Sequence, residues 1–175
     1  DGNLYSSNQY GALYKTTLED GKVSKIEEVK LDIGHSQGLL YAFDSLYVTV
    51  SDKHHGGRGI YRLLDTDGDG NLDKKILIKK FVETGREHGI HSLALAPDGK
   101  SIYIVNGNQT PLFEQDHSRA PKVWKNDNLL PAGFSDKPYF RNVKEPAGWI
   151  SKFSPDGKEW ETIAVGLRNP YDIAF

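Results

Sequence analysis

The chain holds no stretch that could form a regular amphipathic helix, and this limits its fold more than any other feature. No window of about a dozen residues keeps apolar side chains at helical spacing without an intervening Gly or Pro. Short runs rich in Val, Ile, Leu, Tyr and Phe recur instead, with turn signals between them. For example, the short apolar strands Ser92–Ala96 and Ser101–Val105 flank a Pro-Asp-Gly turn. The sequence therefore predicts an all-β fold.

A loose internal repeat organises these strands. Residues 3–29, 45–78 and 101–166 each read as a strand, a polar loop and a Gly-led strand, followed by an Asp/Gly turn and one more strand. A further strand precedes each of the two later units. Four short antiparallel strands per unit are typical of a β-propeller blade, and such rings contain about four to eight blades.

We therefore expect residues 1–175 to be part of a single β-propeller domain, comprising about three blades and cut at both ends. The third unit contains a long insertion, residues 109–147, with five of the eight prolines in the chain. Long loops inside compact domains are usually functional or flexible. We interpret this insertion as a loop on the rim of the propeller.

Composition excludes several function classes. The net charge of −2 favours neither nucleic acid nor an anionic membrane surface as a partner. No apolar run approaches the roughly 18 residues that a membrane helix needs. Cys is absent, which excludes disulfides, thiol catalysis, zinc bound by Cys and covalent c-type haem within this segment.

The stretch DTDGDGNLD, residues 65–73, has the spacing of the first part of a calcium loop. Alternating oxygen ligands on a tight turn converge on one point, and a hard cation offsets their repulsion. Position 12 is Ile76 instead of Glu, and no helices flank the loop, so the EF-hand pattern is incomplete. The alternative is a solvated hairpin turn. We predict a structural Ca²⁺ held by five ligands: Asp65, Asp67, Asp69, Asn71 and Asp73.

Polar side chains also stand just ahead of the first strand of three successive units: Gln37; Glu87 and His88; Arg168 and Asn169. In a propeller the first strand of each blade lines the central channel, so these groups would meet at one mouth of it. They combine a base, a carboxylate, a fixed cation with forked donors, and amides. Such a mixture suits an anionic ligand and a proton transfer.

Simpler interpretations exist for each histidine motif. His88 and His91 are three residues apart, which suits zinc on a helix face, but the stretch leads into a strand and HExxH is absent. A packed histidine is the plainer interpretation, and for His91 we favour packing or a supporting contact behind the site residues. The stretch HHGGRG, residues 54–59, matches no phosphate-binding pattern and is interpreted as a plain loop. No Gly-x-Ser-x-Gly motif marks a nucleophile.

At these motifs the sequence resembles the soluble quinoprotein glucose/sorbosone dehydrogenase family. Its closest resemblance is to the large membrane-bound dehydrogenase-like proteins of planctomycetes and verrucomicrobia. The matching motifs are Gln37 in SQGLLYAF, the acidic-His pair Glu87-His88 five residues ahead of Leu93, and Arg168-Asn169-Pro170. Glu87 stands where the glucose dehydrogenases have Asp.

The resemblance implies a six-bladed propeller that binds pyrroloquinoline quinone (PQQ) at the channel mouth and oxidises a sugar or other alcohol. His88 would be the base, Glu87 would orient it, and Arg168 would stabilise charge on the reduced quinone. Gln37, Arg168 and Asn169 would contact the cofactor. The resemblance also implies a periplasmic or extracellular location, and an electron acceptor such as a c-type haem domain outside this segment.

Two other function classes stay open. One is a non-catalytic propeller, stabilised by calcium, that binds glycan or protein partners. The other is a metal-dependent lactonase, which would need metal-binding carboxylates at the channel. The acidic cluster that the sequence offers, residues 65–73, belongs instead to an outer hairpin.

Overall fold

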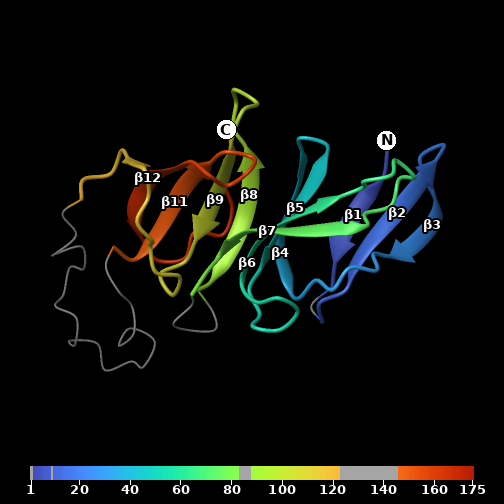
Figure 1. Ribbon diagram of the computed structural model, residues 1–175, viewed down its shortest axis with the longest axis horizontal. Helices are drawn as coiled ribbons and strands as arrows, with labels where there is room; N and C mark the ends of the chain where they lie inside the picture. The colour runs from blue at the N-terminus through green and yellow to red at the C-terminus, as the bar shows by residue number, and fades with distance from the viewer. Residues whose placement is uncertain (1, 9, 83–87, 123–145) are drawn as a thin grey trace. The chain divides into compact units, whose positions relative to one another are not determined.

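The computed structural model of the protein describes residues 2–8, 10–82, 88–122 and 146–175, and it confirms the all-β prediction for them (Figure 1). These residues form twelve strands in three sheets, no helix, and no sheet that closes on itself. The chain divides into two compact units, residues 1–80 and 81–175. Each unit is described by itself, and the arrangement of sheets around a propeller axis stays a prediction.

The first unit contains two antiparallel sheets. The first sheet has three strands in chain order: β1 (Leu4–Ser7), β2 (Leu13–Glu19) and β3 (Lys22–Glu28). The second sheet has four strands, also in chain order: β4 (Ser36–Ala42), β5 (Ser45–Val50), β6 (Gly59–Leu64) and β7 (Lys74–Lys80).

One hydrophobic core joins these two sheets. Leu13 of β2 is buried in the same cluster as Leu46, Val48 and Val50 of β5, and Tyr5 of β1 packs against it. Alternation of apolar and polar residues along the strands places these side chains on the facing surfaces. The unit is therefore two sheets packed face to face, as two blades of a propeller would be.

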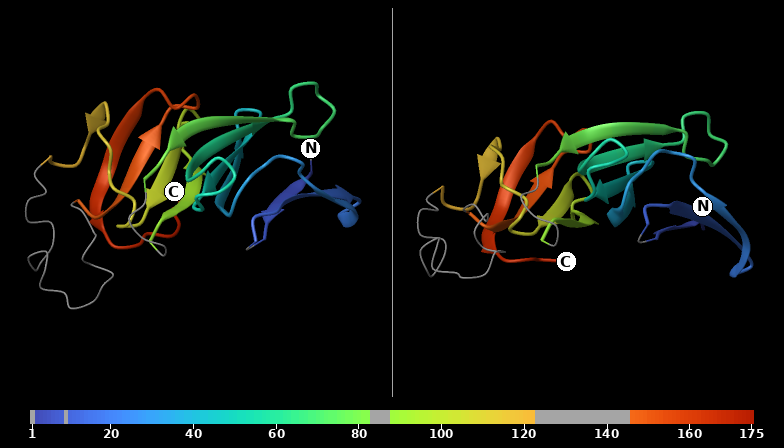
Figure 2. Two further views of the ribbon diagram at one scale, coloured as in Figure 1. Left: turned by 60° about the horizontal axis from the view of Figure 1, so that its bottom comes forward. Right: turned by 90° about the horizontal axis from the view of Figure 1, so that it is seen from below.

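The second unit is built on a single five-stranded sheet with the order β10-β12-β11-β9-β8 (Figure 2). Its strands are β8 (Ile90–Leu95), β9 (Ile102–Asn106), β10 (His117–Ser118), β11 (Gly148–Phe153) and β12 (Trp160–Leu167). Four of them pair antiparallel, and the short β10 pairs parallel to β12. Its core is aromatic: the ring of Phe153 stacks on that of Trp160 with centroids 4.6 Å apart.

The repeat predicted from the sequence corresponds to these sheets. The Gly-led strands are β2, β6 and β11, and β8 and β9 flank the turn at Pro97-Asp98-Gly99. The four-stranded unit is complete in the sheets of β4–β7 and β8–β12. Of the predicted insertion, residues 109–122 and 146–147 are described, and residues 123–145 lie outside the described part of the chain.

The expectation of a further strand after Arg168-Asn169-Pro170 is wrong for the described structure. Residues 168–175 follow β12 without belonging to any strand. Pro170 has no N–H to donate to a ladder, and the carboxylate of Asp172 accepts the backbone N–H of Ile173. A segment becomes a strand only by pairing, and no pairing forms here among the described residues.

Candidate functional site

The candidate site begins at a β-bulge that occurs at the same point in two sheets. In β4, Gln37 and Gly38 together face the single residue Thr49 of β5. In β8, His91 and Ser92 face Val105 of β9 in the same way. A bulge of this kind bends the strand and re-aims a side chain. Gln37 and His91 therefore occupy matching positions, each beside the end of its sheet where the first strand begins.

His88 lies two residues before β8 and is held by the residues that follow β9. Its Nδ1 atom is 2.7 Å from Oδ1 of Asn108, and its backbone N–H donates to Oε1 of Gln109 at 3.0 Å. The backbone N–H of Gln109 donates back to the carbonyl of His88 at 3.0 Å. Because an amide oxygen can only accept, Nδ1 carries the proton and Nε2 carries the lone pair. Nε2 is therefore the ring nitrogen of His88 that can accept a proton.

Asn169 and His91 form the second contact of the site. Nε2 of His91 lies 2.7 Å from Oδ1 of Asn169, and the imidazole is tilted against the ring of Tyr171, with centroids 4.8 Å apart. Burial lowers the pKa of His91 below its usual value, and the nearby charge of His88 adds to this, while the hydrogen bond to Asn169 opposes it. His91 is 6% exposed. It is therefore a neutral, buried donor at neutral pH.

Gly107 closes the space between these two contacts. A Cβ atom at this position would lie 2.5 Å from both Oδ1 of Asn169 and the carbonyl oxygen of His88. The backbone N–H of Asn108 also donates to the carbonyl of Arg168 at 2.9 Å. The structure thus brings His88, Arg168 and Asn169 to one end of the second unit's sheet. Their meeting with groups of other blades at a channel mouth stays a prediction.

For two predicted site residues the structure shows no contact with this group. Gln37 is exposed on the bulge of β4, at the end of its own sheet in the first unit. Glu87 lies outside the described residues, so its predicted role as the orienting group stays a prediction. In the structure it is Asn108 that contacts Nδ1 of His88.

The acidic loop between β6 and β7 brings three of its predicted ligands together. Oxygens of Asp65, Asp67 and Asp69 lie within 4.8 Å of one another, and in the described part of the chain no other such acidic or histidine group exists. Partial desolvation raises the pKa of Asp65, but the backbone N–H groups of Gly70 and Gly68, each 2.8 Å from its carboxylate, outweigh this and lower it. These two backbone N–H groups therefore favour the ionised form of Asp65.

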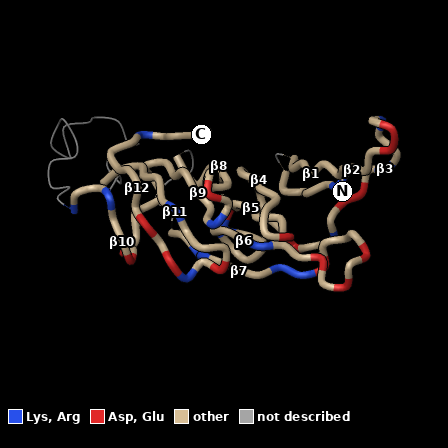
Figure 3. The backbone as a smooth tube through the Cα atoms, turned by 90° about the horizontal axis from the view of Figure 1, so that it is seen from above, with Lys and Arg blue, Asp and Glu red and all other residues tan. Residues whose placement is uncertain are grey.

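The other two predicted ligands of this loop are engaged elsewhere. The Asp73 carboxylate accepts the Thr66 hydroxyl at 2.7 Å. Asn71 donates to Asp69 and accepts from the ammonium of Lys15, which reaches across from β2 and also bonds the carbonyl of Gly70. Figure 3 shows acidic positions in the loop ahead of β7, followed by lysines along that strand. The geometry therefore supports a three-carboxylate cation site with a lysine beside it.

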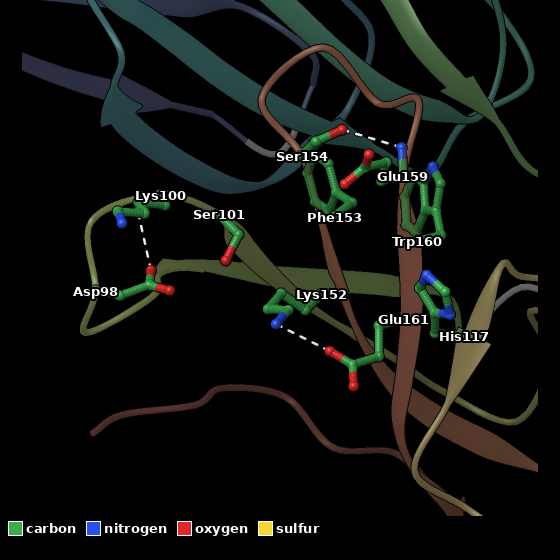
Figure 4. A pocket seen from close by; sticks show the side chains of 10 residues that line it. All are labelled: Asp98, Lys100, Ser101, His117, Lys152, Phe153, Ser154, Glu159, Trp160 and Glu161. Carbon is green, nitrogen blue, oxygen red and sulfur yellow. Dashed lines mark hydrogen bonds and ion pairs between the residues drawn. The ribbon is translucent and has the colours of Figure 1, made fainter.

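A separate polar pocket lies at the other end of the second unit's sheet (Figure 4). It has a volume of about 280 Å³ and is bounded by the β8–β9 turn, β10 and the β11–β12 turn. Lys152 and Glu161 point toward each other across it at 2.9 Å. Arg119 first, and then Lys152, lower the pKa of Glu161 by their hydrogen bonds. The pocket thus offers both donors and acceptors, but it contains none of the predicted site residues.

Sequence reasoning missed Asn108 as the partner of the base. The sequence did contain a signal for this contact. The strands β8 and β9 form an antiparallel hairpin, so the residues that directly follow β9 lie beside those that directly precede β8. Asn106-Gly107-Asn108 follows the second strand directly. The interpretation of His91 as a packed residue, or as one that supports the site residues, agrees with its burial and with its contact to Asn169.

Comparison with models of protein families finds none that matches this chain, and comparison with curated proteins finds no match either. The described residues contain no helix with the length and hydropathy that a membrane crossing requires.

Proposed function

We propose that the chain is part of a six-bladed β-propeller that oxidises a sugar or other alcohol with bound PQQ. The observation that carries this proposal is the arrangement of His88 with Asn108 beside Arg168 and Asn169. A histidine with a fixed tautomer lies at one end of a sheet with the backbone of Arg168 and the amide of Asn169. This is the set of groups that removal of a hydroxyl proton beside an anionic, oxygen-rich cofactor requires.

The chain's part in the reaction is a proton transfer. Asn108 accepts from Nδ1–H of His88, so the lone pair on Nε2 is available to take the proton of a substrate hydroxyl. As that proton leaves, the carbon bearing the hydroxyl becomes a carbonyl and loses a hydride. When bound, the quinone supplies the hydride acceptor.

The donors present suit this cofactor. Arg168 and Asn169 are both exposed at the end of the sheet and offer N–H groups to quinone and carboxylate oxygens. The guanidinium stabilises negative charge that builds on such a ligand. Gly107 permits the close packing of Asn169 against the backbone of His88, which a larger residue would prevent. Gln37 and Glu87 are further contacts that the family resemblance implies.

Calcium belongs to the proposal as a structural ion. The convergent carboxylates of Asp65, Asp67 and Asp69 would bind it between two strands of one blade. The further parts of the proposal follow from the family resemblance: a periplasmic or extracellular location, and an electron acceptor such as a c-type haem domain.

Reconstitution tests the proposal. The full-length protein with PQQ and Ca²⁺ should reduce a redox dye when a sugar is added. His88→Ala should lower kcat by about 100- to 10,000-fold without changing the circular dichroism spectrum. His54→Gln, which changes an exposed histidine of the β5–β6 loop, should leave the rate unchanged. Failure of PQQ to bind the wild-type protein would overturn the dehydrogenase assignment.

A second candidate function is non-catalytic binding of a glycan. The polar pocket at the other end of the sheet favours it, because sugar hydroxyls both donate and accept hydrogen bonds. One side of the pocket is lined by Asp98 and Lys100 of the β8–β9 turn. Another side is lined by the ion pair of Lys152 with Glu161 (Figure 4). Glycan-array binding that is lost in Glu161→Gln and kept in His88→Ala would support this function over oxidation.

A further inference from the structure

We propose that His91 is a positioning residue that fixes the side chain of Asn169 as a hydrogen-bond donor, so that this end of the sheet recognises a carbonyl or carboxylate oxygen of a ligand. The inference deepens the proposed function and rests on it for the ligand's identity. The assignment of the donor itself depends only on the geometry of His91 and Asn169.

The position of His91 on the bulge is the first step. The side chain of a residue in a regular strand stands roughly perpendicular to its sheet. The bulge at His91-Ser92 changes the direction of the His91 side chain. The imidazole meets Asn169 from the segment after β12, and Tyr171 covers its ring. The contact therefore joins residues 78 positions apart in the chain.

The direction of the hydrogen bond is the second step. The amide oxygen of Asn169 faces Nε2 of His91, so Nε2 must carry the proton. With its oxygen engaged by the buried imidazole, the exposed amide of Asn169 presents its two Nδ2 hydrogens to the surroundings. The neighbouring residue Arg168 is also exposed, and a guanidinium can only donate. A reversed amide would present an acceptor instead and would disfavour a ligand oxygen.

A simpler role for His91 is to hold the segment after β12 against the sheet. The two roles differ in what a substitution at either end should do. A clamp needs only an acceptor at position 169 and a packed side chain at position 91. Positioning of a donor also needs the amide nitrogen of residue 169 and a donor at residue 91.

Nuclear magnetic resonance on the ligand-free, full-length protein tests the hydrogen-bond direction. ¹⁵N shifts of the His91 ring at neutral pH should show the proton on Nε2. Nε2 without a proton, accepting from the Asn169 amide, would overturn the inference. This measurement needs no quinone, so it stands even if the proposed dehydrogenase function fails.

Binding of two probes tests the consequence. PQQ offers both quinone and carboxylate oxygens, whereas benzene-1,3,5-tricarboxylate offers carboxylates alone, so the pair separates the two sources of acceptor. Asn169→Asp keeps an acceptor for His91 but replaces the donor with a second acceptor. Asn169→Asp should weaken the binding of whichever probe contacts residue 169 about 10- to 100-fold. Its thermal midpoint of unfolding should equal that of the wild type.

Variants of His91 complete the test. His91→Leu should weaken the same probe about tenfold or more, and His91→Gln, whose amide can still donate, should restore most of the affinity. His54→Gln is the matched control and should bind as wild type does. Equal binding by wild type, Asn169→Asp and His91→Leu would show that the contact is only a clamp.

Discussion

The imidazole of His88 and the side-chain amide of Asn108 meet at the end of the second unit's sheet, with 2.7 Å between Nδ1 and Oδ1. The pairing of Ile90 in β8 with Asn106 in β9 brings the two together across 20 residues of sequence. An amide at this position fixes the tautomer of the base without adding a negative charge beside it. The proposed base and the amide that would orient it thus lie at the two ends of one hairpin.

Removing this amide should lower the rate of the proposed oxidation more than it lowers substrate binding. In Asn108→Leu the imidazole loses its acceptor and can rotate or change tautomer, so we expect kcat to fall about 100-fold with KM nearly unchanged. Asn108→Asp still accepts from Nδ1–H and should restore most of the rate. Steady-state kinetics on the reconstituted protein measure both, and equal rates for Asn108→Leu and wild type would contradict the role of Asn108.

Gly107 should tolerate no larger residue. Its φ is not in the left-handed region, so the cost of Gly107→Ala is steric, arising from the backbone carbonyl of His88 and the side chain of Asn169. We expect a loss of about 1–3 kcal/mol in the free energy of unfolding. The displaced His88 and Asn169 should also weaken ligand binding. Urea denaturation and titration with PQQ measure the two effects, and an unchanged unfolding midpoint would contradict this packing.

The strands of the fold could be predicted because they depend on local patterns. Gly59 and Gly148 begin strands that the repeat identified, and Gly99 forms the turn that the Pro-Asp-Gly motif indicated, with φ of 66°. The strand β10 could not be predicted, because two residues carry no periodic signal. Its pairing with β12 depends on the path of the loop that precedes it.

The site was predicted in its members and only partly in its contacts. His88, Arg168 and Asn169 lie at one end of a single sheet, whereas the channel argument, which concerns successive blades, stays a prediction. Which amide contacts which imidazole depends on the strand register and on the bulge at His91, neither of which the sequence pattern specifies. For the acidic loop, spacing predicts ligands, but it could not show that Asp73 accepts from Thr66.

Calcium should stabilise the first unit through the acidic loop. If Asp65, Asp67 and Asp69 bind the ion, adding Ca²⁺ in excess of its Kd should raise the thermal midpoint, since a ligand that binds only the folded state stabilises it. Asp67→Asn should reduce this increase. Asp20→Asn, in the Asp-Gly turn between β2 and β3, is the matched control and should keep it.

Lys15 offers a second test of the same loop. Its ammonium bonds the carbonyl of Gly70 and the side chain of Asn71, and a positive charge there opposes a bound cation. Lys15→Gln should therefore raise the affinity for Ca²⁺, which isothermal titration calorimetry measures. A lower affinity in this variant would show that Lys15 helps to shape the cation site.

The aromatic core of the second unit should depend strongly on Trp149. The side chain is fully buried, lies against Phe81 and Phe113, and donates from Nε1 to the carbonyl of Thr110 at 2.7 Å. Trp149→Ala should cost about 3–5 kcal/mol of unfolding free energy. Leu95→Ala, at a position of the same sheet that is 40% exposed, should cost far less. Similar unfolding midpoints for the two variants would contradict this account of the core.

Stability in acid should depend on the turn between β11 and β12. The hydroxyl of Ser154 and then the ammonium of Lys158 bond the Asp156 carboxylate and lower its pKa from 3.8 to about 2. Because the folded pKa lies below the unfolded one, this contribution is complete above about pH 4 and is lost as the pH falls toward about 2. In Asp156→Asn the free energy of unfolding should therefore fall less steeply than in the wild type between about pH 4 and about pH 2.

Lys158→Gln removes one partner of Asp156. The slope of its unfolding free energy against pH should lie between those of the wild type and Asp156→Asn. Chemical denaturation at a series of pH values between about 2 and about 5 measures the slopes. A ¹³C titration of the Asp156 carboxyl measures the pKa directly. A carboxyl that titrates near 3.8, or equal slopes for wild type and Asp156→Asn, would show that the turn does not hold this carboxylate ionised.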